Sequence, residues 1–318
     1  MQYKTLNLLN QILVEAQQKQ QKPIQRVIMD KTKVKETMEE LKREITEKKK
    51  DINFKELFTI YSSFYSYSFY NCLLIHAQRS GAEFVAGFQT WRKKYNRQVN
   101  RGEKGIQILA PNRKKIVDEE TDKVYYKLMG FRVVYVFDIT QTSQIEGKKV
   151  IITESGTPLQ KPEKEQLRLL EEFNITFTNF IENEKIPLIY ISEERIGLAK
   201  GMTEGKHIYI KKEIPFYEQF FAKIHEWVHF TLHFTRDTKT NIIRPNSKYS
   251  RERMELEAET VLYIVAKHFG LKTGSIEYLA SWQKKEDIME SLQNVHGLSR
   301  IIIQVLEESK VIKDSIGD

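Results

Sequence analysis

Residues 225–229, which read His-Glu-Trp-Val-His, constrain this chain more than any other segment. On a helix, two histidines four residues apart lie one turn apart on the same face, with the glutamate beside them. Apolar residues around the segment follow helical spacing, and Pro215 stands where a first helical turn tolerates proline. The pattern therefore predicts a buried helix on which His225 and His229 bind Zn²⁺ and Glu226 is the general base.

A zinc site of this kind needs a third protein ligand, which is often a carboxylate on the next helix. Residues 253–259 offer Glu255, Glu257 and Glu259. Glu255 and Glu259 are four apart and share a helical face, whereas Glu257 points about 200° away. We therefore expect Glu255 to be the third ligand and Glu259 to hold a ligand imidazole from outside the coordination sphere. Such a site suits peptide hydrolysis, in which Glu226 takes a proton from metal-activated water.

Two alternatives stay open for this region. One is a helix whose histidines serve packing alone, and the other is a metal site without catalytic activity. We interpret His233, four residues beyond His229, as an outer partner or a packing residue, because a straight helix rises about 6 Å over that spacing. Tyr249, Tyr263 and His268 are equal candidates for stabilising an oxyanion.

The composition is typical of a soluble intracellular protein. A chain of 318 residues with 40% hydrophobic residues is large enough for two domains. Cys72 is the single cysteine, so no intramolecular disulfide can form and an oxidising compartment is not indicated. The first residues lead into Gln- and Lys-rich sequence, and no run is apolar and long enough to span a membrane. We therefore expect a cytoplasmic protein without a membrane partner.

Positive charge is concentrated between Phe84 and Lys115. This segment has nine basic residues and one acid, so it carries a charge of +8, equal to that of the whole chain. Aromatic and amide side chains interleave with the cations, which is typical of a groove that neutralises phosphates and stacks the bases of single-stranded nucleic acid. The candidate binding residues are Trp91, Arg92, Lys93, Lys94, Arg97, Gln98, Arg101 and Lys104. The alternative is a solvated basic face around a core tryptophan.

The first half of the chain predicts a small α+β domain. An aromatic run from Phe54 to Tyr70 has helical spacing and predicts a helix pair. Strands are expected at 84–88 and 105–109, the second closed by Pro111, around a basic helix at 90–95. A hairpin over 125–137 is expected to turn at Met129-Gly130.

The predicted division of the chain has four parts. They are a charged helical arm at 1–50, a nucleic-acid-binding domain at 51–142, a linker at 143–162 and a metallopeptidase-like domain at 163–318. In the last of these we expect a helix from about Glu163 to Phe173, and strands at 186–191 and 208–210. By analogy with zinc peptidases, 206–210 is the expected edge strand for an extended peptide.

Several separated blocks of the N-terminal half resemble ArdC-type antirestriction proteins. They are Tyr67-Ser-Phe-Tyr-Asn71, Leu74-Ile-His-Ala-Gln-Arg79, Phe84-Val-Ala-Gly-Phe-Gln-Thr-Trp91, Arg97-Gln-Val, Arg101-Gly-Glu-Lys-Gly-Ile106, Ile108-Leu-Ala-Pro111 and Tyr135-Val-Phe-Asp138. The C-terminal half resembles the metallopeptidase-like domain of the same proteins through residues 225–229 and 255–259, and is also similar to the ImmA/IrrE group.

The resemblance implies an α+β fold of two domains. These would be an N-terminal domain that binds single-stranded DNA and a C-terminal zincin-like metallopeptidase domain. Such proteins reside on plasmids, conjugative elements or phages, where they shield incoming DNA from restriction. The family commonly has a small or aliphatic residue where Trp227 stands, which implies different substrate access beside Glu226.

Three hypotheses about function follow. The first is a single-stranded-DNA-binding protection factor of a mobile genetic element, whose zinc domain is structural or weakly active. The second is a DNA-localised zinc protease that cleaves a host nuclease or a repressor and therefore needs Glu226. The third is a plain cytosolic peptidase with an incidental basic face, which would not bind an oligonucleotide at moderate salt. We favour the first two combined.

Overall fold

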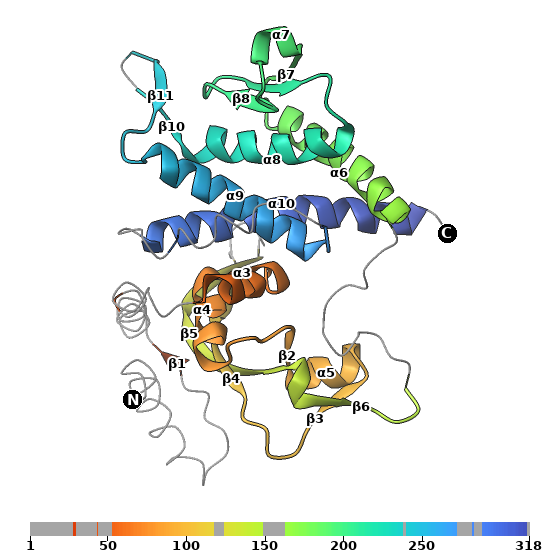
Figure 1. The fold of residues 1–318 in the computed structure, drawn as a ribbon. Coiled ribbons are helices and arrows are strands. Elements are labelled where there is room, and N and C mark those ends of the chain that lie inside the picture. The colour runs from red at the N-terminus through yellow and green to blue at the C-terminus, as the bar shows by residue number, and fades with distance from the viewer. Residues whose placement is uncertain are drawn as a thin grey trace. The chain divides into compact units, whose positions relative to one another are not determined.

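The computed structural model of the protein describes residues 28–29, 43, 53–117, 124–148, 163–237, 240–271, 282 and 288–316 (Figure 1). Apart from 28–29 and 43, the expected arm at 1–50 lies outside the described residues, as does the part of the expected linker from 149 to 162. The chain forms two compact units. The N-terminal unit comprises Met1–Asn53 and Tyr70–Gly156, and the C-terminal unit comprises Phe54–Phe69 and Thr157–Asp318.

The C-terminal unit is mainly helical and has α8 in its middle layer. Its described elements are α3 (Phe54–Ser63), α6 (Glu163–Asn183), β7 (Leu188–Ile191), α7 (Glu193–Ile196), β8 (Gly201–Thr203), β9 (Ile208–Lys211), α8 (Phe216–Leu232), β10 (Phe234–Arg236), β11 (Ile243–Pro245), α9 (Arg251–His268) and α10 (Ile288–Ile316). Figure 1 shows the small sheet on one side of α8, and α9 and α10 on the other. Apolar residues such as Phe220, Ile224 and Val228 are buried on α8. The expected helix around residues 225–229 is thus present and buried.

The three-stranded sheet of this unit corrects one prediction. Its order is β7-β9-β8, with β9 parallel to β7 and antiparallel to β8. Residues 208–211 therefore form the central strand, and both of their edges are already hydrogen-bonded. An extended peptide cannot pair with a strand that has no free edge. The expectation that 206–210 offers the substrate edge was wrong.

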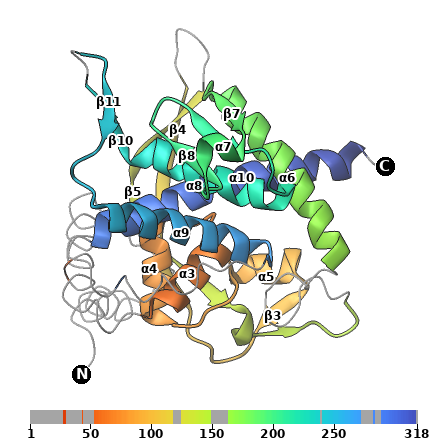
Figure 2. The same ribbon diagram turned by 45° about the horizontal axis from the view of Figure 1, so that its top comes forward.

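Helix α3 belongs to the C-terminal unit, although we predicted it within a domain at 51–142. The rings of Phe54 and Phe58 pack against Trp282 with centroid distances of 6.0 and 5.5 Å. Figure 2 shows α3 next to α9, which it contacts. Sequence spacing revealed the apolar face of α3, but it did not reveal which core that face joins.

His296 of α10 gives the C-terminal unit a testable pH dependence. Its ring is 5% exposed and lies 5.0 Å from the ring of Tyr61. Burial and, to a smaller extent, the nearby Arg300 charge lower the pKa of His296 to about 4. The unfolded chain binds this proton near pH 6.5, so acidification from pH 6.5 to 4 favours unfolding, by roughly 3 kcal/mol at most.

We therefore expect His296→Leu to flatten the dependence of unfolding free energy on pH within that window. The measurement is urea unfolding of the wild type and the variant at several pH values between 7 and 4. Because other groups also titrate there, the difference between the two proteins is the relevant quantity. Equal slopes in both proteins would contradict the prediction.

The N-terminal unit is built around a long two-stranded ribbon. Its described elements are β1 (Ile28–Met29), α4 (Phe69–Gln78, which begins one residue before the unit), β2 (Val85–Gly87), α5 (Phe88–Lys94), β3 (Arg97–Val99), β4 (Ile106–Val117), β5 (Val124–Asp138), η2 (Ile139–Gln141) and β6 (Thr142–Gln144). Strand β5 pairs antiparallel with β4, β1 and β2, and β3 pairs with β6. The unit is therefore α+β, as predicted.

The ribbon differs from the predicted hairpin. Strand β4 continues through Pro111 to Val117, and Pro111 pairs in register with Phe131. Proline is tolerated there because β4 has no further strand beyond it in the described sheet. Met129 and Gly130 lie inside β5, next to a shift of register between Asn112 and Arg113. A bulge, rather than a turn, thus accounts for the positive φ of 143° at Gly130.

The outer edge of β4 is protected by two side-chain amides of α4. Asn71 donates to the Leu109 carbonyl and accepts from the Leu109 N–H, both at 2.9 Å. Gln78 makes the equivalent pair with Gln107, at 2.8 and 2.9 Å. Residues seven apart share a helical face, so α4 presents both amides to the strand. The edge is thereby closed to pairing with another chain at Gln107 and Leu109.

Candidate metal centre and basic surface

Helices α8 and α9 bring three candidate ligands together. The Nε2 atoms of His225 and His229 are 3.0 Å apart. The Oε2 atom of Glu255 lies 3.3 Å from Nε2 of His225 and 3.7 Å from Nε2 of His229. The three donor atoms thus form a compact triangle, with His225 and His229 on α8 and Glu255 on α9.

The dimensions of this triangle fit a small tetrahedral cation. Zinc–nitrogen and zinc–oxygen bonds of about 2.0–2.2 Å place neighbouring tetrahedral ligand atoms roughly 3.3 Å apart. The three observed edges of 3.0, 3.3 and 3.7 Å bracket that value. Two imidazole nitrogens and one carboxylate oxygen also match the donor set of catalytic zinc sites, which keep a fourth position open.

Each histidine of the triangle has a polar partner at Nδ1, the ring nitrogen that is not part of the triangle. Nδ1 of His225 lies 3.2 Å from Oε1 of Glu259, the residue expected to fill this role. Burial lowers the pKa of His225, but the contacts with Glu255 and Glu259 outweigh it and raise the pKa to about 10. Without a metal, a proton therefore occupies His225. Contacts with His225 and His229 hold the pKa of Glu255 well below its usual range, so its carboxylate is ionised.

His229 is held by a buried chain of three further side chains. Its Nδ1 lies 2.9 Å from Nδ1 of His233, and Nε2 of His233 lies 3.0 Å from Oε2 of Glu257. Arg253 donates to the other oxygen of Glu257 at 2.9 Å. His233 and Glu257 are both fully buried. In this structure His233 is therefore an outer partner of His229.

The hydrogen-bonded series His233, Glu257 and Arg253 selects one tautomer of His229. A neutral His233 that donates from Nε2 to Glu257 has an accepting Nδ1. His229 must then donate from Nδ1, which leaves the lone pair of its Nε2 facing Glu255 and His225. The contact is geometrically possible because α8 ends at Leu232, and His233 leaves the straight helix as its C-cap.

Glu226 lies on α8 beside the triangle and is 9% exposed. Burial raises the pKa of Glu226 to about 7, although the His225 charge opposes this shift. Strand β8 packs directly over it: a Cβ atom at Gly201 would lie 2.6 Å from Cγ of Glu226. Glycine at 201 is thus required for this close approach. A buried carboxyl group that titrates near neutral pH is suited to proton transfer.

Other residues considered around this centre have different roles. Trp227 packs its ring on Phe177 and Phe180 of α6, at 5.9 and 5.6 Å, so it belongs to the helix packing. This corrects the expectation that it shapes access to Glu226. His268 contacts the Ser62 carbonyl at 2.6 Å and Glu307, more than three turns of α9 from Glu255. Of the oxyanion candidates, Tyr249 packs its ring 5.5 Å from the His233 ring.

The basic segment of the N-terminal unit presents most of its predicted binding residues to solvent. The exposed residues are Arg92, Lys93 and Lys94 on α5, Gln98 on β3, and Arg101 and Lys104 in the loop before β4. Trp91 and Arg97 are different, because they are 0% and 5% exposed. The predicted set thus divides into six surface residues and two buried ones.

Trp91 and Arg97 have structural roles, which corrects their assignment to DNA binding. Trp91 Nε1 donates to the Phe137 carbonyl at 2.8 Å, and its ring packs with Ala86 and Ile139. Arg97 donates from Nε to the Thr142 hydroxyl at 2.8 Å and from an Nη atom to the Thr142 carbonyl at 2.9 Å. A buried side chain with satisfied donors cannot stack on a base or contact a phosphate in this structure.

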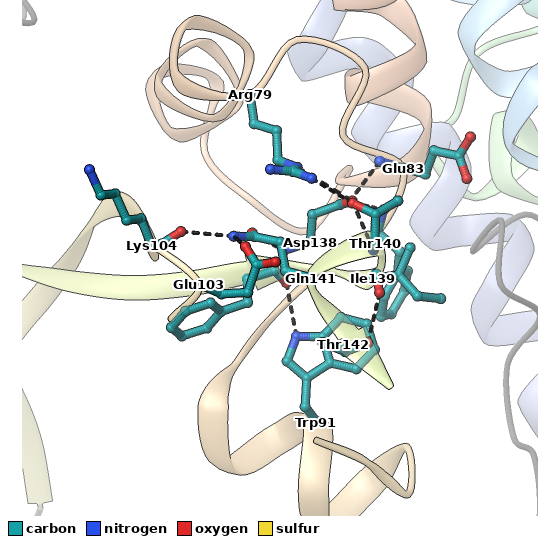
Figure 3. A network of polar contacts seen from close by, with 12 residues as sticks. Arg79, Glu83, Trp91, Glu103, Lys104, Asp138, Ile139, Thr140, Gln141 and Thr142 are labelled. Carbon is teal, nitrogen blue, oxygen red and sulfur yellow. Dashed lines mark hydrogen bonds and ion pairs between the residues drawn. The ribbon is translucent and has the colours of Figure 1, made fainter. Parts of the chain in front are cut away.

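A polar network holds the basic loop in place (Figure 3). The side chain of Asp138 accepts from the backbone N–H groups of Glu83, Phe84 and Thr140. Gln141 accepts from the Asp138 N–H at 3.0 Å and donates to the Lys104 carbonyl and to Glu103, both at 2.8 Å. Residues from three of the sequence blocks that resemble ArdC-type proteins therefore meet in this network, namely Phe84, Glu103 with Lys104, and Asp138. The network fixes the loop that carries Arg101 and Lys104.

Within the described residues, none of the helices is both long and apolar enough to cross a membrane.

The fold and the two sites define a mixed α/β protein with a basic N-terminal unit and a three-donor cluster on two helices of its C-terminal unit. Residues 18–137 match the family model of the N-terminal domain of the anti-restriction factor ArdC. The chain therefore carries an ArdC-type N-terminal domain, which confirms the resemblance for this half.

Comparison with whole proteins gives more distant matches. An uncharacterized protein of Bacillus anthracis is 25% identical over 298 residues, which cover 80% of this chain and 47% of that protein. The chain thus spans about half the length of this curated relative. The antirestriction ArdC protein from the R388 plasmid matches with a TM-score of 0.40 in both its metal-free and its Mn(II)-bound crystal structure. These matches have 18% and 17% identity and cover 76% of this chain and 85% and 84% of those chains.

Proposed function

We propose that this protein is an antirestriction-type factor of a mobile genetic element that binds single-stranded DNA through its N-terminal unit. The observation that carries the proposal is the match of residues 18–137 to the ArdC N-terminal domain. The exposed cations of α5 and of the loop at 101–104 support it, because phosphate neutralisation is the main source of affinity for nucleic acids. Bases exposed in a single strand are also accessible to aromatic side chains, as they are not in a duplex.

The test is binding of a fluorescent single-stranded oligonucleotide and of its duplex to the full chain across a salt series. We expect tighter binding of the single strand, with affinity falling steeply as salt rises. Replacing both Arg101 and Lys104 by alanine should reduce the logarithmic salt slope for the single strand by about 1.4, because each lost phosphate contact accounts for about 0.7.

The matched control replaces two exposed cations of the C-terminal unit, Arg195 and Lys212, by alanine. This variant has the same change in net charge and should retain the slope. Equal slopes in the two variants would show that net charge alone attracts the DNA. Equal affinity for duplex and single strand would contradict the single-strand preference.

We further propose that the C-terminal unit binds Zn²⁺ through His225, His229 and Glu255, with Glu259 holding His225. The donor set and the triangle of 3.0, 3.3 and 3.7 Å support this assignment. Mn²⁺ also accepts carboxylate and imidazole ligands, so both ions belong in a binding experiment. Zn²⁺ at such a site would activate water and polarise a carbonyl group.

A second candidate function is a DNA-localised zinc protease that cleaves a host nuclease or a repressor. The specific observation in its favour is the position of Glu226, a buried carboxyl group beside the triangle of donor atoms, where it could accept a proton from water and return it. Strand β8 lies over Glu226 and occupies one edge of the sheet β7-β9-β8. A protease needs Glu226, whereas protection by DNA binding needs the basic residues. The two functions therefore differ in the residues on which they depend.

A further inference from the structure

The N-terminal unit exposes two aromatic rings beside its basic loop. Phe88, the first residue of α5, is 49% exposed, and Tyr135 of β5 is 46% exposed. Phe137 contacts both neighbourhoods: it shares a face of β5 with Tyr135, because alternate strand residues point the same way. The rings of Phe88 and Phe137 are 6.1 Å apart at 69°.

The inner side of this aromatic group is fixed by the core. Phe137 packs against the buried cluster of Trp91, Ala86 and Ile139, and its carbonyl accepts the Trp91 indole N–H. The rings of Phe88 and Tyr135 therefore stand on a rigid base, while about half of their surface stays in water. Neighbouring exposed aromatic rings with a polar rim are typical of an interaction site.

The basic loop passes close to Tyr135 and Phe137. A Cβ atom at Gly105 would lie 2.9 Å from Cβ of Tyr135 and 3.2 Å from the Phe137 ring, so only glycine permits this approach. The backbone of Lys104, the residue before Gly105, thus lies near Tyr135, and the Gln141 side chain donates to the Lys104 carbonyl at 2.8 Å (Figure 3). On the other side, Arg92 stands one helical turn after Phe88 on the same face of α5. Cations therefore flank the rings on both sides.

We infer that Phe88 and Tyr135 form a platform on which bases of single-stranded DNA stack, while Arg92, Arg101 and Lys104 contact the flanking phosphates. This inference rests on the proposed binding of single-stranded DNA and assigns the stacking residues for it. The charge around the platform favours a polyanionic ligand, because the three cations beside it are exposed. The nearby acid Glu103 accepts a hydrogen bond from Gln141. Trp91, which the sequence suggested for stacking, supports the platform from inside.

The experiment measures the affinity of the full chain for labelled oligothymidylate and for an abasic strand of the same length. We expect Phe88→Ala and Tyr135→Ala each to weaken binding of oligothymidylate about 5- to 100-fold, which corresponds to one lost base stack. The salt slope should not change, because neither substitution removes a cation. The abasic strand should bind the wild type and the Phe88→Ala/Tyr135→Ala double variant equally, since it has phosphates but no bases.

Two further variants test whether the effect comes from stacking. Tyr135→Phe retains the ring and should bind like the wild type. Tyr126→Ala is the matched control, because Tyr126 is 63% exposed on the same strand, in the distal part of the ribbon. It should also bind like the wild type. Thermal unfolding of all variants checks that the N-terminal unit stays folded.

The outcomes separate the platform from the proposed function. If the wild type binds oligothymidylate and the double variant binds it equally well, the platform is overturned and DNA binding stands. If the alanine variants weaken the abasic strand as much as oligothymidylate, base stacking is overturned as the cause. If the wild type binds neither strand at moderate salt, the proposed function fails, and the platform fails with it.

Discussion

Replacing Glu255 by glutamine is expected to lower the affinity of the protein for Zn²⁺ about 100-fold or more. Structural zinc sites with four ligands bind with an apparent free energy of about 10–16 kcal/mol, or roughly 3 kcal/mol for each ligand. A loss of that size corresponds to about two orders of magnitude in affinity. Glutamine conserves the size of the side chain but replaces an anionic oxygen by a neutral one, so the change isolates the metal contact.

Glu226→Gln is the matched control for this prediction. Glu226 is also a carboxyl group at the centre, but it is absent from the triangle of donor atoms. We therefore expect this variant to bind Zn²⁺ within a few-fold of the wild type. Competition with a chromophoric chelator measures both affinities, and the zinc-dependent rise in unfolding temperature gives a second readout. Equal loss in both variants would mean that the assignment of Glu255 as ligand is wrong.

Much of this centre could be predicted because helical periodicity is a strict local rule. The four-residue spacing places His225 and His229 on one face of α8, and the same spacing places Glu255 and Glu259 on one face of α9. Neither inference needs knowledge of the tertiary fold beyond the meeting of two helices. The position of Glu259 behind His225 follows from the same face, and the structure places it there at 3.2 Å.

The pairing of His233 with Glu257 could not be predicted by the same rule. Sequence spacing correctly placed Glu257 away from Glu255, but it could not identify a partner for it. That partner is found because α8 ends at Leu232 and the C-cap His233 departs from helical geometry. The ends of helices are the least predictable part of a sequence-based assignment.

In the N-terminal unit, composition predicted the basic character of the surface but not which side chains form it. Trp91 and Arg97 have the residue types of a DNA-binding groove, yet tertiary packing buries both. Phe88 and Tyr135 have no distinguishing local pattern, and their exposure depends on the pairing of β5 with β2 and β4. Long-range strand pairing of this kind is not encoded in any short window.

Replacing Glu257 by alanine is expected to reduce the free energy of unfolding of the metal-free C-terminal unit by about 3–5 kcal/mol. Glu257 is fully buried and accepts from Arg253 at 2.9 Å, and its other oxygen lies 3.0 Å from His233 Nε2. Burial raises its pKa, but hydrogen bonds with His233, Ser291 and Arg253 outweigh this effect, so the folded-state pKa is low. Removing Glu257 leaves the fully buried His233 ring without its hydrogen-bond partner and takes from Arg253 the more buried of its two carboxylates, which accounts for the large loss.

Glu290→Ala is the matched control, because Glu290 contacts the same arginine at 3.2 Å but is 33% exposed. Partly exposed ion pairs contribute about 1 kcal/mol or less. Urea unfolding in the presence of a chelator measures both losses without the contribution of bound metal. Losses of equal size would show that the network around Glu257 has no special role in stability.

Substitution of Glu257 is also expected to change the affinity of the metal centre for Zn²⁺. Without Glu257, nothing fixes the tautomer of His233, and His233 in turn no longer selects the form of His229 that presents Nε2 to the ligand triangle. Loss of an outer partner of a metal-bound histidine typically lowers metal affinity 10- to 100-fold. We therefore expect Glu257→Gln, which retains a hydrogen-bond acceptor, to keep more of the Zn²⁺ affinity than Glu257→Ala. Equal affinities in the wild type and the alanine variant would show that the buried chain supports the fold without orienting His229.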